Sequence, residues 1–248
     1  MKKYEFNDKI AILLSGILGA IVFLLIYGPY SLNVCEDSWI LRQYDGPDII
    51  QNYAGWTQYR ISNWNYPLGY ADTLAYGDGT YITYTDSIPY LAILFKLFRN
   101  ILPETFQFFG WFTLGCFVLQ GIGAGLLIKR KYRSYFKILV GDVFFLTAPI
   151  LIERVFKHTA LGAQWFCLFA LYYYLEYRAK EKDAKLPWQL ILLAGLTVGI
   201  HPYFLPMVMI FVLAVILEAL LKRYSMLKIA GFTLASVIVP CGLGIVMG

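Results

Sequence analysis

Residues 10–28 read IAILLSGILGAIVFLLIYG, and this stretch decides the class of fold. It contains no charged residue, and its length is close to the roughly 20 residues that an α-helix needs to cross the hydrocarbon core of a bilayer. Lys2, Lys3 and Lys9 precede it, as basic residues precede the apolar part of a signal peptide. The run is long for a signal peptide, however, and no small-residue cleavage site follows it. We therefore predict an uncleaved first membrane helix.

The composition of the whole chain also indicates a membrane protein. Of its 248 residues, 59% are hydrophobic and only 15% are charged, whereas soluble domains usually contain about 25% charged residues. The net charge of +5 comes from basic residues in short clusters between apolar runs, which argues against a nucleic-acid partner. The four cysteines show neither metal-ligand spacing nor a disulfide framework. We expect an all-α integral membrane protein whose partner is the lipid bilayer.

Apolar stretches of near-membrane length recur along the chain and predict about seven transmembrane helices. The third and fifth stretches are short, and Pro187 suits the first turn of the fifth helix. The predicted spans are 10–28, 106–128, 135–152, 160–177, 187–200, 203–221 and 227–247.

The segment 87–102 is apolar enough to be an eighth span, but it carries Lys96 and Arg99. If it lies in the membrane surface, 15 of the 21 basic residues fall on the inner side, whereas only 7 do so if it crosses. Because basic residues concentrate on the cytoplasmic side, we predict an in-plane juxtamembrane helix at 87–100. The N-terminus is then cytoplasmic, and residues 29–105 form one long extracytoplasmic loop.

These features predict a multi-pass protein of the plasma (inner) membrane, with residues 1–248 as a single transmembrane module. The chain stops within or just after an apolar helix at Gly248, as a fragment of a longer protein would. Asp142 lies inside the third predicted span, where a carboxyl group is costly in lipid, so we expect it to face a helix partner or water.

The outer loop contains the first candidate site residue. Asp-Gly-Pro at 45–47 forms a turn, and Asp48 then begins a predicted helix that carries Gln51 and Arg60. A helix cap is the usual role of an aspartate in this place, and a cap can also act chemically. We take Asp48 as a candidate catalytic acid and Gln51 and Arg60 as candidate substrate-binding residues.

Asp86 is the second candidate acid of the loop, directly before the predicted juxtamembrane helix, where capping is again the simple interpretation. Trp and Tyr side chains crowd the same loop. Amphipathic rings favour the headgroup level of a membrane, and aromatic faces also pack against sugar rings. The sequence leaves both interpretations open.

The short outer loop after the third predicted span concentrates potential cations at the membrane surface. Arg154, Lys157 and His158 follow one another there. Arg154 has the forked geometry that suits a phosphate, and Lys157 supplies a point charge, although pairing with Glu153 or with lipid headgroups is equally compatible. The other histidine, His201, lies at the outer end of the fifth predicted span. Two histidines at one depth leave a divalent cation open, but they make no metal site without carboxylates from elsewhere.

At this point the chain resembles the GT-C superfamily of membrane glycosyltransferases, which share an N-terminal span, a long first outer loop with an early Asp, and in-plane helices. It also resembles a bacterial family of GT-C-like membrane proteins of unknown function. The segments that carry this second resemblance are 46–60, 64–69, 85–89, 157–161 and 200–204.

The resemblance implies an inverting glycosyl transfer from a polyprenyl-phosphate sugar donor at the extracytoplasmic face, in cell-envelope synthesis. Asp48 matches the early loop acid and would act as the general base. Asp86 would orient the acceptor or a metal, and Arg154 and His158 would stabilise the departing lipid phosphate. Lys157 and His201 would also contact substrate.

The chain departs from the superfamily pattern because Ile49, not a second acid, follows Asp48, and Asp45 is a partner at unusual spacing. A non-catalytic membrane partner of a cell-envelope complex is therefore one alternative. A transporter is another, although we find no repeated halves and only Asp142 as an acid well inside a predicted span.

Overall fold

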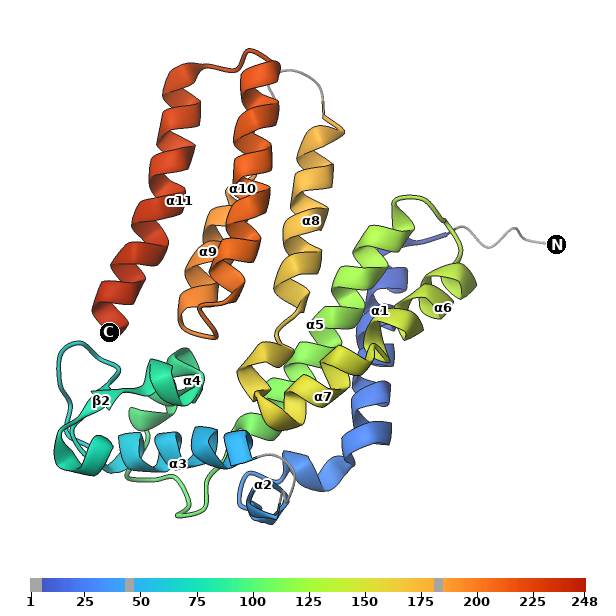
Figure 1. Cartoon of the computed structure of the whole chain (residues 1–248). Coiled ribbons are helices and arrows are strands. Elements are labelled where there is room, and N and C mark those ends of the chain that lie inside the picture. The colour runs from blue at the N-terminus through green and yellow to red at the C-terminus, as the bar shows by residue number, and fades with distance from the viewer. Residues whose placement is uncertain (1–5, 43–46, 181–184) are drawn as a thin grey trace. The chain divides into compact units, whose positions relative to one another are not determined.

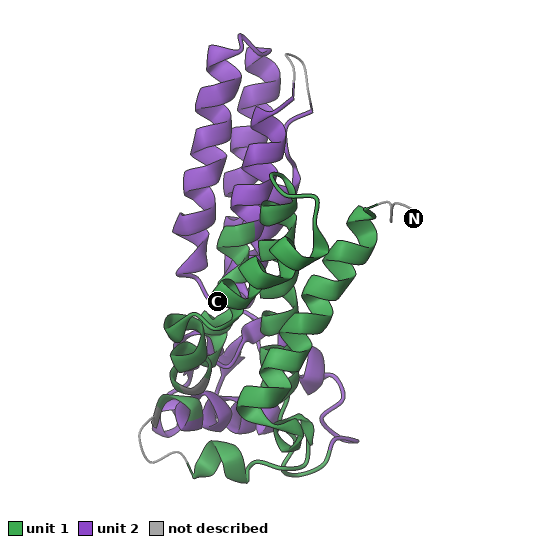
Figure 2. Ribbon diagram, turned by 90° about the vertical axis from the view of Figure 1, so that its right-hand side faces the viewer, with its two compact units in different colours: residues 1–49, 103–168 green, residues 50–102, 169–248 purple. Residues whose placement is uncertain are grey.

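The computed structural model describes residues 6–42, 47–180 and 185–248, which are predominantly helical (Figure 1). Contacts between Cα atoms divide the chain into two compact units, coloured separately in Figure 2. Unit 1 contains residues 1–49 and 103–168, and unit 2 contains residues 50–102 and 169–248. Each unit therefore combines a part of the predicted outer loop with helices from elsewhere in the chain.

Unit 1 is built mainly on two long helices and a bent pair. Its elements, in chain order, are α1 (Asp8–Tyr27), η1 (Pro29–Leu32), α2 (Ser38–Leu41), the first residues of α3 (Pro47–Ile61), α5 (Phe109–Lys129), α6 (Tyr135–Leu146), α7 (Pro149–Lys157), η4 (Thr159–Gly162) and the start of α8 (Trp165–Arg178).

Small residues allow α1 and α5 to pack closely along their length. A Cβ atom added to Gly19 of α1 would collide with the backbone of Phe117, and one added to Gly121 of α5 would collide with that of Ser15. Between membrane helices, where lipid supplies little hydrophobic driving force, such close backbone contact is a main source of stability. The glycines of these two apolar segments therefore determine which faces meet.

The two ends of unit 1 differ in character. At one end, Asp8 lies 3.2 Å from Nζ of Lys129 and 3.6 Å from Arg133. At the other end, the buried Gln107 side chain donates 2.9 Å hydrogen bonds to the backbone oxygens of both Ser31 and Asn33. The first end carries a basic cluster, and the second carries the loops that hold the candidate site residues.

Unit 2 combines a small loop layer with four helices. It contains the rest of α3, a two-stranded antiparallel sheet of β1 (Tyr70–Ala71) and β2 (Thr80–Tyr81), the short helices η2 (Ala75–Gly77) and η3 (Ile82–Thr85), and α4 (Pro89–Lys96). The rest of α8, α9 (Gln189–Val198), α10 (Phe204–Leu221) and α11 (Met226–Met247) complete it.

The loop layer of unit 2 covers the ends of α9 and α11. Backbone N–H groups of Leu68 and Gly69 donate to the oxygens of Val246 and Met247, each at 2.8 Å. These bonds satisfy carbonyl groups in the last turn of α11, which have no partner within the helix. At the opposite end of this unit, Lys222 donates to backbone oxygens at the end of α8. The basic residue Lys222, at the end of α10, thus lies at the end of this unit opposite its loop layer.

Four described helices are long and apolar enough to cross a membrane, namely α1, α5, α10 and α11. The predicted span 135–152 is not one straight helix: α6 and α7 pass the same criteria together, but their axes meet at a bend of 51°. Pro149 starts α7 and excludes the helical conformation from the residue before it, which explains the break. With α8 and α9 at 14 and 10 residues, the described residues contain four or five candidate spans, and seven are not confirmed.

The predicted juxtamembrane segment 87–100 contains a helix, but a short one. α4 has 8 residues, about 12 Å of rise at 1.5 Å per residue, and irregular turns follow it. An α-helix of that length does not cross a bilayer. The position of α4 in the plane of the membrane remains a prediction.

Candidate functional site

Asp48 and His158 form a pair within unit 1. The Oδ2 atom of Asp48 lies 3.3 Å from Nε2 of His158, and both side chains are about one-third exposed or more. Asp48 lies in the first turn of α3, after Pro47 at the start of the helix. The carboxylate is therefore inside the helix terminus, where the helix dipole stabilises a negative charge. His158 directly follows α7, and its backbone N–H bonds to Arg154 at 2.7 Å.

Arg154 and Lys157 come from the last turn of α7, next to His158. Residues three apart lie on the same face of a helix, so Arg154 shares a face of α7 with Lys157. Lys157 is exposed and Arg154 is partly buried. Cations also stabilise the negative end of a helix dipole, which is the structural explanation for both. Two permanent cations thus lie in the turn of α7 that directly precedes the histidine of the pair.

Asp86 and His201 form the second pair, within unit 2. Oδ1 of Asp86 lies 3.2 Å from Nε2 of His201, whose side chain is only 6% exposed. Nδ1 of His201 accepts a hydrogen bond from the backbone N–H of Tyr203 at 3.2 Å. A ring nitrogen that accepts a hydrogen bond carries no proton, so the proton of this imidazole lies on Nε2, facing Asp86. His201 is thus held from both sides.

Contacts of Tyr90 bring Asp86 close to His201. Its backbone N–H donates to the oxygen of Gly199, and its hydroxyl donates to the oxygen of Gly195, each at 2.9 Å. A Cβ atom on Gly199 would collide with the Tyr90 ring. The start of α4 is therefore fixed against the end of α9, which brings the residues just before α4 next to His201. Burial raises the pKa of the Tyr90 hydroxyl, which keeps it a hydrogen-bond donor.

The backbone around Asp86 is held in an uncommon shape. Asp86 and Ile88 both have left-handed conformations, with φ of 53° and 52°, and this is costly for a β-branched residue such as Ile88. Ser87 compensates by donating to the oxygen of Asn52 at 2.7 Å. No side chain caps α4, whose N-cap residue is Ile88. The sequence-based expectation that Asp86 caps this helix is therefore wrong, because its carboxylate turns to His201 instead.

Gln51 and Arg60, the remaining candidates, contact the protein itself. Nε2 of Gln51 lies 3.5 Å from the oxygen of Tyr84, a contact at the limit of hydrogen bonding. The guanidinium of Arg60 donates to the oxygens of Arg99 and Leu102 at 3.0 and 2.6 Å. Arg60 therefore stabilises the turn after α4, and Asp45 lies outside the described residues.

The sequence did not predict the surroundings of Lys96. It was considered only as a charged residue that makes segment 87–102 a poor transmembrane span. Its side chain is 1% exposed, and Nζ lies 3.9 Å from the ring centre of Tyr59 and 4.7 Å from that of Trp64. Nζ also donates to Ser62 Oγ and to the oxygen of Asn63, at 2.8 and 2.9 Å. Burial, with help from a nearby arginine, lowers the pKa of Lys96 to about 8. The available signal was the grouping of Tyr59, Ser62 and Trp64 within six residues.

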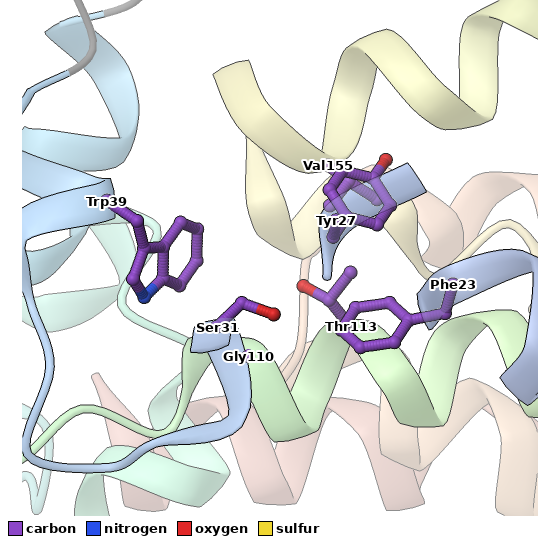
Figure 3. Close-up of a pocket in the computed structure, with 7 residues that line it drawn as sticks. All are labelled: Phe23, Tyr27, Ser31, Trp39, Gly110, Thr113 and Val155. Atoms are coloured by element: carbon purple, nitrogen blue, oxygen red, sulfur yellow. The ribbon is translucent and has the colours of Figure 1, made fainter. Parts of the chain in front are cut away.

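The pocket in Figure 3 lies in unit 1, between Trp39, Tyr27 and Thr113. Its empty volume is about 160 Å³, below the 300–1,000 Å³ typical of small-molecule sites. None of the candidate site residues lines it. It is therefore too small to hold a sugar.

The side chains around the two Asp–His pairs do not form a binding site for a divalent cation in the described part of the chain. Within residues 6–42, 47–180 and 185–248, no three His, Cys, Asp or Glu side chains gather as a metal would require. A metal on Nε2 of His201 would also move the ring proton to Nδ1, where it would face the N–H of Tyr203. The pair as found is arranged to orient a carboxylate.

Comparison with known proteins adds the family. No curated protein and no solved structure matches the chain. A family model described as "Domain of unknown function (DUF6311)" matches residues 16–248. This range includes both Asp–His pairs and all the described candidate spans except the first residues of α1. Because the match extends over nearly the whole sequence, the chain belongs to the DUF6311 family.

Proposed function

We propose that this protein is an inverting membrane glycosyltransferase, which moves a sugar from a polyprenyl-phosphate donor to a hydroxyl acceptor at the extracytoplasmic face of the plasma membrane. The observation that carries the proposal is the accessible Asp48–His158 pair, whose histidine directly follows the α7 turn that carries Arg154 and Lys157. A carboxylate next to fixed cations suits a reaction that removes a proton at one atom and releases a phosphate at another. The resemblance to GT-C enzymes supports the same reaction.

In the proposed reaction, the acceptor oxygen attacks the anomeric carbon from the side opposite the phosphate. Asp48 takes the hydroxyl proton, and the bond from carbon to the phosphate oxygen breaks with its electrons staying on the phosphate. His158 orients the Asp48 carboxylate through Nε2. Because His158 is used in this way, the negative charge on the departing phosphate would be stabilised by Arg154 and Lys157. In unit 2, His201 is the positioning residue of the second loop acid, Asp86.

The test has a binding part and a transfer part. Saturable binding of a polyprenyl phosphate to protein in lipid nanodiscs should weaken at least tenfold in Arg154→Gln and remain unchanged in Arg133→Gln, which alters a cation at the opposite end of unit 1. Asp48→Asn should bind the donor normally but lose sugar transfer, whereas Asp78→Asn, in an exposed turn, should keep it. Full transfer by Asp48→Asn would exclude the mechanism. Binding without any transfer in wild type would favour the non-catalytic partner.

The orientation can be tested on the native cysteines. Cys35 is exposed in the outer-loop part of unit 1, whereas Cys116 is buried in α5. A membrane-impermeant maleimide should label Cys35 in intact spheroplasts, while Cys35→Ser should abolish the labelling. A Ser134→Cys substitution in the Cys35→Ser background, at the opposite end of unit 1, should react only after lysis. The reverse pattern would invert the proposed topology.

A further inference from the structure

The turn between α5 and α6, residues 130–134, gathers basic side chains at one end of unit 1 (Figure 1). α5 meets the length and composition criteria for a membrane span, and α6 meets them together with α7. A polar turn between two such segments belongs at the level of the lipid headgroups. The basic residues of this turn and of the helix ends that flank it are Lys129, Arg130, Lys131, Arg133 and Lys137.

These cations differ in their partners. Nζ of Lys129 lies 3.2 Å from one carboxylate oxygen of Asp8, and the guanidinium of Arg133 lies 3.6 Å from the other. Asp8 is the first residue of α1, so this pairing joins α1 to the end of α5 and to the turn. In the part of the chain that the structure describes, no carboxylate lies within ion-pair distance of Lys131 or Lys137. Their charges are therefore not neutralised by the protein.

Lys131 and Lys137 both contact the ring of Tyr132. Their Nζ atoms lie 5.6 and 5.3 Å from the centre of that ring. Tyr132 is 40% exposed, and both lysines are exposed as well. Two like charges held near one ring repel each other, and an anion close to both removes that repulsion. A tyrosine at the headgroup level places its apolar ring toward the lipid and its hydroxyl toward water. The cluster thus suits the phosphate group of a lipid.

α6 carries an exposed apolar stripe that begins beside this cluster. Phe136 and Phe144 are 77% and 74% exposed, and Val140 between them is exposed too. These residues are four apart and so lie on one face of the helix, and Lys137, three residues before Val140, is their neighbour on that face. The opposite face of α6, which includes Ile138, is buried. The stripe offers the apolar contact that acyl chains need directly below two ammonium groups.

We propose that the turn 130–134 and the exposed face of α6 bind an anionic phospholipid of the surrounding leaflet. Its phosphate lies close to the ammonium groups of Lys131 and Lys137, and its acyl chains pack along the stripe of α6. Basic residues next to a membrane span attract anionic lipids in this way. The proposal is independent of glycosyl transfer and of the Asp48 site, and it applies to either orientation of the chain in the membrane.

Lipid binding by the full chain tests the proposal. Native mass spectrometry of the detergent-purified protein gives dissociation constants for phosphatidylglycerol and for phosphatidylcholine with the same acyl chains. Wild type should prefer the anionic lipid by at least about tenfold, as two lysines near one lipid should produce. Lys131→Gln/Lys137→Gln should lose this preference, whereas Lys180→Gln/Lys228→Gln should keep it. The control removes the same charge from two exposed lysines of unit 2, and Lys228 also lies over a tyrosine ring.

A second measurement locates the lipid. Phosphatidylglycerol with a diazirine in its acyl chain, incorporated into proteoliposomes, should label residues 136–144 in wild type and label them less in Lys131→Gln/Lys137→Gln. Both variants change exposed side chains, so their thermal unfolding midpoints should equal that of wild type.

Three results would overturn the proposal. The first is an anionic preference that survives in Lys131→Gln/Lys137→Gln. The second is an equal loss in both double variants, which would mean that net charge and not this site attracts the lipid. The third is displacement of phosphatidylglycerol by millimolar glycerol phosphate, which would show a site for free phosphate that does not use the stripe of α6.

Discussion

Nε2 of His201 lies 3.2 Å from Oδ1 of Asp86, which joins the turn after α9 to the loop before α4. The 6% exposure of the imidazole means that its polar atoms depend on protein partners. With the Tyr203 N–H on the other nitrogen, the ring is fixed in orientation and in the place of its proton. His201 is therefore a positioning residue for Asp86.

This proton placement predicts a spectroscopic result. The chain has two histidines, so a His158→Gln variant labelled with ¹⁵N-histidine reports on His201 alone. Its nitrogen shifts should indicate a protonated Nε2 and an unprotonated Nδ1, and they should not change on adding Zn²⁺. A proton on Nδ1, or a zinc-induced shift, would contradict the assigned hydrogen bonds.

The contact between Gly199 and Tyr90 predicts a stability difference. Gly199→Ala would push a methyl group into the Tyr90 ring, and overpacking of this kind costs about 1–3 kcal/mol. Gly242→Ala on α11 is the control, since no atom lies within 4 Å of its added Cβ. Thermal unfolding in detergent should show a lower midpoint for Gly199→Ala alone. Equal midpoints would mean that Tyr90 does not dock on Gly199.

The close packing of α1 on α5 predicts a second difference of the same kind. Gly19→Ala would place a methyl group against the backbone of Phe117, which cannot move as a flexible side chain would. We expect a loss of about 1–3 kcal/mol in unfolding free energy. Gly115→Ala on α5, where the added Cβ meets nothing within 4 Å, should leave stability nearly unchanged. Two equally stable variants would show that α1 and α5 are not in close backbone contact.

Lys96 predicts a dependence of stability on pH. Its pKa is about 8 in the folded protein and 10.5 for an ordinary lysine, so between these values the unfolded chain binds more protons. Stability should therefore rise with pH in this window, by at most about 1.4 kcal/mol per pH unit for one proton. Thermal unfolding of wild type and Lys96→Met should be compared from pH 7.5 to about 10. A parallel pH dependence in both proteins would exclude Lys96 as the cause.

Several features could be predicted from local sequence alone. Apolar length was sufficient for α1, α5, α10 and α11, because a long apolar run has one stable conformation in lipid, the helix. The same criterion failed for the stretch 135–152, where Pro149 breaks the helix within an apolar run. Hydropathy measures the cost of burial and does not register the backbone geometry that proline imposes.

The sequence predicted the candidate site residues in part. The residue types and their positions in loops pointed to Asp48, Asp86, His158 and His201, because polar groups at the ends of apolar runs are exceptional. Their pairing was not visible in the sequence, since 110 and 115 residues separate the partners. Arg60 also matched the pattern of a binding residue, but its guanidinium bonds to backbone oxygens within its own unit.

By itself, the sequence determined that this is a helical membrane protein with a polar, aromatic loop, because the cost of burying charge and free backbone groups in lipid acts on each segment separately. Only the tertiary structure decided which carboxylate meets which imidazole, that Lys96 is enclosed by aromatic rings, and that Asp142 of α6 is fully buried. Those outcomes depend on contacts between distant segments, whose geometry is set by close packing of glycines and by hydrogen bonds to the backbone.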